Sequence, residues 1–274
     1  MKLITCLLIL IPLVSLSQMK MSIDPKTSKI KYDVLGSVIA LSGDVFRSDD
    51  DGLDSRRVGF KFGIKKGDII TTGKNSFVKI QLIDETVISL GPDTHFSFKD
   101  YNFESITDRN ANFDLLKGKM RIKVNNKIER GKLKFNTMSI SLGVRGTEFL
   151  ANQSILKTGQ AIEQVALLSG KLEINGKDAN IKKTLSPNMY VRTKRVEGKE
   201  IRVKYGKLSK KTVSKLSSNI KGNKDFLRFL DDKDQDFNFS KSERLELNSI
   251  DSSKKKDWKN WKDSLKKLNQ KYHD

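Results

Sequence analysis

The feature that most constrains the fold is an alternation of apolar and polar residues that recurs between about residues 36 and 195. Clear examples are the segments "FVKIQL" at 77–82, "KMRIKV" at 119–124, "KLKF" at 132–135 and "MSISL" at 138–142. A period of two places the apolar side chains on one face of a strand that is buried on that side. Residues 36–195 are therefore predicted to form an all-β domain.

Turn-forming residues separate these segments at fairly regular spacing. Examples are Gly67–Asp68, Lys117–Gly118, Asn125–Asn126 and Ser186–Pro187–Asn188. Many short strands divided by such turns are typical of a sandwich, a barrel or a β-roll. Residues 36–195 contain no convincing 3.6-residue period of helical length, which disfavours a βαβ fold.

The N-terminus has the features of a secretory signal peptide. Lys2 precedes an apolar run that ends at Leu16, and the small residues Ser15 and Ser17 predict cleavage before Gln18. The run is shorter than the ~20 residues of a membrane span, although an uncleaved anchor is the alternative. We expect residues 1–17 to be removed, residues 18–35 to form a linker, and the mature chain to be periplasmic or secreted.

Two bulk properties limit the partners and the chemistry. The only cysteine, Cys6, lies within the predicted signal peptide, so the mature chain would lack thiolates and disulfides. The formal net charge of +20 favours polyanionic partners. Export disfavours nucleic acid, and no membrane span is expected after cleavage. We therefore expect the partner to be an envelope protein or an anionic envelope polymer or lipid.

The last part of the chain has a different pattern. Residues 205–274 are predicted to form a small, basic helical region, because Trp258 and Trp261 share one helical stripe with Leu265 and Leu268. From Arg192 to the end there are 24 Lys and Arg against 13 Asp and Glu, a net charge of +11. Two interpretations stay open for Trp258 and Trp261: docking on an anionic interface, or packing against the β domain or neighbouring helices.

Several motifs occur in an order that resembles the FecR domain, an all-β module of bacterial envelope proteins. They span about residues 36–193 and include "IKKGDIITTGKNSFVKIQL", "FDLLKGKMRIKV", "ISLGVRGTEFLA" and "VALLSGKLEI". The resemblance implies a FecR-like β-sandwich or β-roll. It also implies a binding, scaffold or signalling module in the periplasm. The sigma-regulating role of FecR-type proteins is not carried over, because we expect neither a cytoplasmic segment nor a membrane helix.

The chain departs from the family pattern at two turns. The family usually has glycine where this chain has Glu85 and Asn188. Asparagine tolerates a left-handed backbone better than most residues, so the second change is mild. The first leaves the turn type at residues 84–86 open.

The stretch "SLGVRGTEFL" at residues 141–150 contains the most characteristic motif of that resemblance. One interpretation makes Arg145 an anion-binding residue that Gly143 and Gly146 leave accessible. The other is structural and is favoured here. In it the glycines allow a tight bend, the Arg145 guanidinium satisfies carbonyls or a carboxylate beneath the sheet, and Thr147 extends that polar network.

Catalytic machinery is hard to find in this sequence. The two histidines are His95, which we expect at a turn or on the surface, and His273 near the C-terminus. Neither is paired with a recognisable nucleophile. We therefore expect a non-enzymatic protein. A glycan-active enzyme with two carboxylates is a minor alternative, because carboxylates that meet only in space cannot be found from sequence.

A calcium site is the sharpest chemical prediction. The segment at 232–243 places oxygen-bearing side chains at positions 1, 3, 5, 7, 9 and 12 of a loop that resembles an EF-hand, namely Asp232, Asp234, Asp236, Asn238, Ser240 and Glu243. Phe237 occupies the sixth position, where EF-hands need glycine. The alternative is a solvated acidic loop in which Ser240 and Glu243 cap a helix. A calcium-dependent adaptor is thus the second functional hypothesis.

Overall fold

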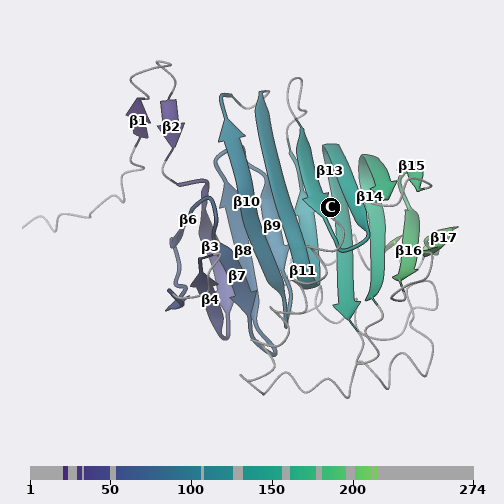
Figure 1. Cartoon of the computed structure of the whole chain (residues 1–274), viewed down its shortest axis with the longest axis horizontal. Coiled ribbons are helices and arrows are strands. Elements are labelled where there is room, and N and C mark those ends of the chain that lie inside the picture. Colours follow the sequence, from purple (N-terminus) through teal and green to yellow (C-terminus); the bar gives the residue numbers. More distant parts are fainter. Residues whose placement is uncertain are drawn as a thin grey trace, which may run out of the picture.

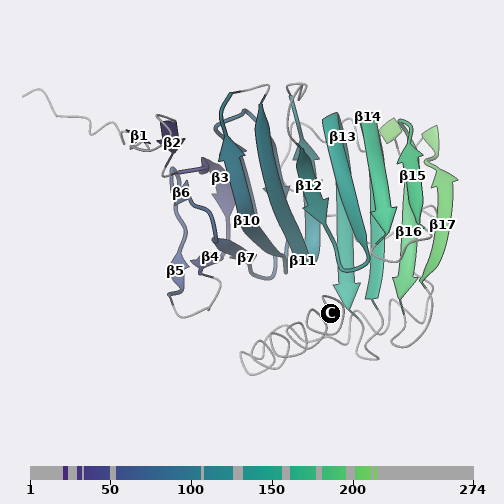
Figure 2. The same ribbon diagram turned by 45° about the horizontal axis from the view of Figure 1, so that its top comes forward.

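A computed structural model describes the residue ranges 21–23, 30–32, 34–49, 54–105, 108–125, 132–155, 161–176, 181–195, 201–210 and 213–214. These residues form an all-β fold, as predicted. Strands β1 (Met21–Ile23) and β2 (Ile30–Tyr32) make a separate antiparallel pair. The remaining strands belong to one continuous hydrogen-bonded sheet that folds over on itself. Figures 1 and 2 show its strands side by side, with β3, β4 and β6 at one end and β17 at the other.

The folded sheet has two layers that share three long strands. These are β11 (Arg109–Lys123), β13 (Ile140–Ile155) and β14 (Ala161–Gly176). Layer one adds β5 (Arg56–Arg57), β4 (Val45–Ser48), β7 (Ile69–Thr72), β10 (His95–Phe103), β12 (Leu133–Asn136) and β15 (Lys182–Leu185). Layer two adds β6 (Gly63–Ile64), β3 (Gly36–Ser42), β8 (Phe77–Leu82), β9 (Val87–Leu90), β16 (Met189–Arg195) and β17 (Arg202–Lys207).

Each long strand changes partners near its middle. Strand β13 pairs with β12 through Val144 and with β11 from Glu148 onward. Strand β14 pairs with β16 through Ala166 and with β15 from Leu172 onward. One half of each strand therefore lies in layer one and the other half in layer two, which makes the fold a β-roll.

Glycines with left-handed backbone stand at these crossings. Gly118, Gly146 and Gly170 have φ angles of 96°, 59° and 85°. A β-carbon on Gly170 would lie 2.8 Å from Thr147 Cγ2, so glycine also lets β13 and β14 approach closely at the corner. The prediction of a turn between strands at Lys117–Gly118 is wrong, because these residues lie inside β11. The glycine bends one continuous strand from one layer into the other.

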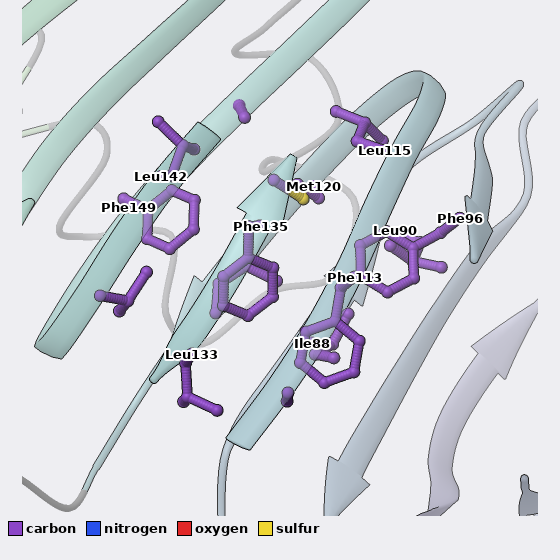
Figure 3. Close-up of a cluster of buried hydrophobic side chains, with 14 of the residues drawn as sticks. Ile88, Leu90, Phe96, Phe113, Leu115, Met120, Leu133, Phe135, Leu142 and Phe149 are labelled. Atoms are coloured by element: carbon purple, nitrogen blue, oxygen red, sulfur yellow. The ribbon is translucent and has the colours of Figure 1, made fainter. Parts of the chain in front are cut away.

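The core fills the space between the layers. Phe96, Phe113 and Phe135 point inward from layer one and meet Ile88 and Phe149 from layer two (Figure 3). The ring centroids of Phe113 and Phe135 lie 4.9 Å apart, and those of Phe135 and Phe149 lie 5.5 Å apart. These aromatic contacts join the two layers into one hydrophobic core.

Both turns that depart from the family pattern contain a residue with left-handed backbone. This agrees with the prediction for Asn188, and it settles the turn type at Glu85, which was open. Glu85 has a φ of 65° and Asn188 a φ of 64°. The Asp84 side chain supports the first turn by accepting hydrogen bonds from the Thr86 amide at 2.9 Å and the Thr86 hydroxyl at 3.0 Å. The left-handed backbone conformation that favours glycine is thus present at both positions, although neither residue is glycine.

The boundaries of the domain differ from the prediction at both ends. Within the expected linker, β1 and β2 pair, and Leu35 is buried in the core. The β domain continues past residue 195, because β17 pairs with β16 from Lys194↔Arg202 to Met189↔Lys207. Residues 205–207, expected to be helical, are therefore strand. Residues 215–274 lie outside the described part of the chain.

Candidate anion-binding face

The "SLGVRGTEFL" stretch forms the corner of β13. Gly146 has a φ of 59°, and the pairing of β13 with β14 shifts register between Arg145 and Glu148. Val144 and Thr147 are buried on either side of the bend, whereas Arg145 is exposed. The glycine at position 146 therefore supplies the predicted tight bend, and the bend presents Arg145 on the outer face of layer one.

The prediction that Arg145 and Thr147 form a polar network beneath the sheet is wrong. Among the described residues, the Arg145 guanidinium has no hydrogen-bond partner, and the buried Thr147 Oγ1 has none either. The neighbouring carboxylate instead pairs with another arginine. Arg121 on β11 donates from Nε to Glu148 Oε1 at 2.8 Å, on the outer face of layer two. Glu148 follows the bend at Gly146, so it lies in layer two with Arg121, whereas Arg145 lies in layer one.

Arg145 stands in a row of cations that crosses three neighbouring strands. On β14, Lys171 lies directly opposite Arg145. On the other side, Lys132 precedes Leu133, whose partner on β13 is Val144, so continuing the register brings Lys132 opposite Arg145. Lys134 lies two residues further along β12, opposite Gly143. All four cations are exposed. We call Lys132, Lys134, Arg145 and Lys171 the cationic patch.

Like charges in directly opposed positions destabilise a β-sheet, because their side chains lie close together. A bound anion removes that repulsion and gains charge-assisted hydrogen bonds from guanidinium and ammonium groups. Gly143 lies between Lys134 and Glu173, and the Glu173 side chain lies over it, since a β-carbon on Gly143 would be 3.6 Å from Glu173 Oε2. The patch is therefore an exposed cationic surface with one carboxylate at its edge.

A hydrogen-bonded polar network flanks the patch on the same face. Asn136 Nδ2 donates to Asp114 Oδ1 at 2.8 Å, and Ser141 Oγ donates to Asn136 Oδ1 at 2.7 Å. Asn136 Nδ2 also lies 2.5 Å from Asn112 Oδ1. These bonds fix the orientation of side chains on three adjacent strands. The outer face of layer one is thus a polar, ordered surface around the cationic patch.

His95 is neither a turn residue nor fully exposed. It begins β10, is half-buried, and its Nδ1 lies 2.9 Å from Thr71 Oγ1. Burial, assisted by the charge of Lys117, lowers the pKa of His95 to about 3. The imidazole is therefore neutral at physiological pH.

Two buried carboxylates were not found from the sequence. Asp84 and Arg109, both 0% exposed at the side chain, pair at 2.5 Å between Asp84 Oδ2 and Arg109 Nε. Glu163 accepts from the Ser139 amide at 2.6 Å and from Thr193 Oγ1 at 2.7 Å. Arg109, Ser139 and Thr193 each lie at least 24 residues away in the chain from the carboxylate that they contact. Both carboxylates hold turns or strand starts in place.

The other predicted sites fall outside the described part of the chain. These are the calcium ligands Asp232, Asp234, Asp236, Asn238, Ser240 and Glu243, together with Trp258, Trp261 and His273. Among the described residues, no group of three or more His, Cys, Asp or Glu side chains is placed to hold a metal ion. The same residues include no helix with the length and apolarity of a membrane span.

Residues 68–173 match the family described as FecR protein. Two crystal structures of a protein assigned as an anti-sigma factor, from Parabacteroides distasonis, are similar to this chain with a TM-score of 0.44 each. One is 18% identical and the similarity covers 56% of this chain and 65% of that one; the other is 16% identical, with 56% and 64% covered. The similarity thus spans less than two thirds of these relatives. No match was found among curated proteins.

Proposed function

We propose that the chain is an exported, non-enzymatic signalling or scaffold module that binds an anionic partner through the cationic patch. The match of residues 68–173 to the FecR protein family supports a module of this kind. The partner is an acidic envelope protein surface or an anionic envelope polymer or lipid. The predicted signal peptide at residues 1–17 supports export to the periplasm or beyond.

The observation that carries the proposal is the register of the patch. Arg145 on β13 lies directly opposite Lys171 on β14, and Lys132 immediately precedes β12, next to the Leu133↔Val144 pair; all three are exposed. A sheet that only needed solubility would gain more from alternating charges in these opposed positions. Three like charges in register favour a surface that is completed by a ligand of opposite charge.

Charge reversal in the full-length mature chain tests the proposal. The variant Lys134→Glu/Arg145→Glu/Lys171→Glu should lose at least tenfold in affinity for the anionic partner, because attraction becomes repulsion. Binding is measured separately to lipopolysaccharide, to phosphatidylglycerol vesicles and to acidic proteins of an envelope extract. These three arms identify the source of the anionic group.

The matched control changes the same charge elsewhere. Lys61→Glu/Lys65→Glu/Lys74→Glu alters three exposed lysines in turns outside the patch. It should retain binding to within about threefold, since long-range attraction is largely screened beyond ~10 Å at 0.1 M salt. Equal losses in the two variants would show that only net charge matters and would overturn the proposal. Absence of binding in every arm would do the same.

The calcium-dependent adaptor stays a prediction from the sequence. Its ligand set at residues 232–243 lies outside the described part of the chain. The glycan-active alternative gains no support from Asp84 and Glu163, since both are buried and already hydrogen-bonded to neighbouring groups.

A further inference from the structure

The outer face of layer two is buried at its centre. Leu150, Ala166 and Tyr190 stand directly opposite one another on β13, β14 and β16. Their side chains point away from the main core and form a second hydrophobic cluster. Leu150 and Ala166 are each 1% exposed, and Ile162, on the same face of β14, is 0% exposed. An outward sheet face with such low exposure is a covered face.

The chain turns onto this face after the last strand. The Leu208 amide donates to the Asn188 carbonyl at 2.7 Å, and the Val213 amide donates to the Ser209 carbonyl at 2.9 Å. Leu208 belongs to the second cluster and Val213 packs against it. The segment that follows β17 therefore starts on the outer face of layer two, and 60 residues follow residue 214.

Cations line one side of the apolar centre. Along one row, Lys119, Asn152, Gln164, Arg192 and Lys204 are successive partners on β11, β13, β14, β16 and β17. The next row places Lys194 beside Ile162 and opposite Arg202. A segment that fits this face needs apolar side chains for the centre and carboxylates for the rim.

We infer that residues 225–247 of the same chain lie on this face. The segment contains eight Phe and Leu residues, and its charged residues are seven Asp and Glu against four Lys and Arg. Its net charge of −3 complements the cationic rim. The chain length after residue 214 is ample to bring it back across the sheet.

Charge distinguishes this occupant from the other apolar segment of the tail. Residues 254–271, which contain Trp258 and Trp261, have eight Lys and Arg against two Asp and Glu. A net charge of +6 would be repelled by Lys119, Arg192, Lys194, Arg202 and Lys204. The acidic segment lies on layer two, and the basic segment does not share that surface.

Lysine cross-linking of the full mature chain tests the inference. The segment contains two lysines, Lys233 and Lys241. An amine-reactive cross-linker of about 10 Å, followed by mass spectrometry, should join them to Lys119, Lys194 or Lys204. Lys134, Lys171 and Lys182 on the outer face of layer one are the internal control and should give at least fivefold fewer links. Mixing ¹⁴N- and ¹⁵N-labelled protein separates links within one chain from links between chains.

A charge variant provides the second measurement. Asp231→Lys/Asp234→Lys/Asp236→Lys should remove most links from residue 241 to layer two, because the segment becomes cationic like the rim. The matched variant Lys255→Glu/Lys259→Glu/Lys266→Glu, in the basic segment, should leave them unchanged.

Three outcomes would overturn the inference. The first is equal linking of Lys233 and Lys241 to both layers. The second is predominant linking of layer two to Lys259 or Lys262, which would make the basic segment the occupant. The third is a set of links found only between chains, which would assign this face to a second copy of the protein.

Discussion

The two outer faces of the roll are built partly from the same strands, yet their surfaces are opposite in character. On β13, Ser141 and Arg145 point outward from layer one and reach solvent, whereas Leu150 and Asn152 point outward from layer two and are 1% and 2% exposed. The bend at Gly146 separates the two sets. A single alternating strand can therefore serve a solvated face with one half and a covered face with the other.

The largest expected contrast is between two truncations on β13. Leu150→Ala should lower the free energy of unfolding by about 2–4 kcal/mol, because it removes buried methyl groups and leaves a cavity. Ser141→Ala, its counterpart on layer one, should change stability by less than about 1 kcal/mol. Urea unfolding of both variants checks the contrast. Similar small losses would show that the outer face of layer two is open to solvent.

The pH dependence of stability tests the burial of His95, a half-buried residue on layer one, whose outer face is otherwise solvated. Its pKa is lowered to about 3 in the folded protein, so the unfolded chain takes up this proton first as the pH falls below about 6.5. Stability is therefore lost between pH 6.5 and 3. Between pH 7 and pH 4.5, the free energy of unfolding of the wild type should fall by about 1–3 kcal/mol more than that of the His95→Gln variant. An equal loss of stability in the wild type and the His95→Gln variant between the two pH values would contradict the burial of His95.

Two arginines near the same corner should differ by a smaller amount. Arg121 on layer two is hydrogen-bonded to Glu148, and its side chain is only 10% exposed. Arg121→Ala should cost about 1–3 kcal/mol, because it leaves a carboxylate without its partner in a mostly buried site. Arg145→Ala should leave stability within about 0.5 kcal/mol, since the side chain is exposed. Thermal unfolding measures both. An equal cost would mean that Arg145 has a structural role.

The smallest effect concerns repulsion within the cationic patch. Lys171→Glu replaces a like-charge pair with an opposite-charge pair across β13 and β14, and should stabilise the protein by a few tenths of a kcal/mol. The gain should fall as NaCl is raised from 0.05 to about 1 M, because exposed charges are screened. A salt-independent change, or a loss of stability at low salt, would argue against close apposition of Arg145 and Lys171.

Local patterns in the sequence were sufficient for the strand content and for much of the core. The alternation in residues 77–82 and 119–124 identified β8 and the second half of β11. The resemblance to the FecR family indicated a left-handed residue at Asn188 but left the turn type at Glu85 open. The length of the strands was missed. Glycines such as Gly118 were interpreted as turns between strands, because a bend within a continuous strand and a turn between strands use the same residue for the same backbone reason.

The candidate site was predicted only in part for a different reason. Arg145 was identified from its motif, but its neighbours Lys132 and Lys171 are distant in sequence and meet it through strand register. The exposed positions of "KLKF" and "GKLEI" contained that signal, yet the pairing of the strands is needed to align them. The ion pair between Asp84 and Arg109 depends on the same long-range pairing and could not be found from local patterns.

The central claim is that the two outer faces differ in accessibility. It is tested most directly by the rate of lysine acetylation in the folded, full-length mature chain, resolved by residue with mass spectrometry. Lys134 and Lys171 on layer one should react at least several times faster than Lys119 and Lys194 on layer two, and unfolding in urea should remove the difference. Equal rates in the folded protein would contradict the account.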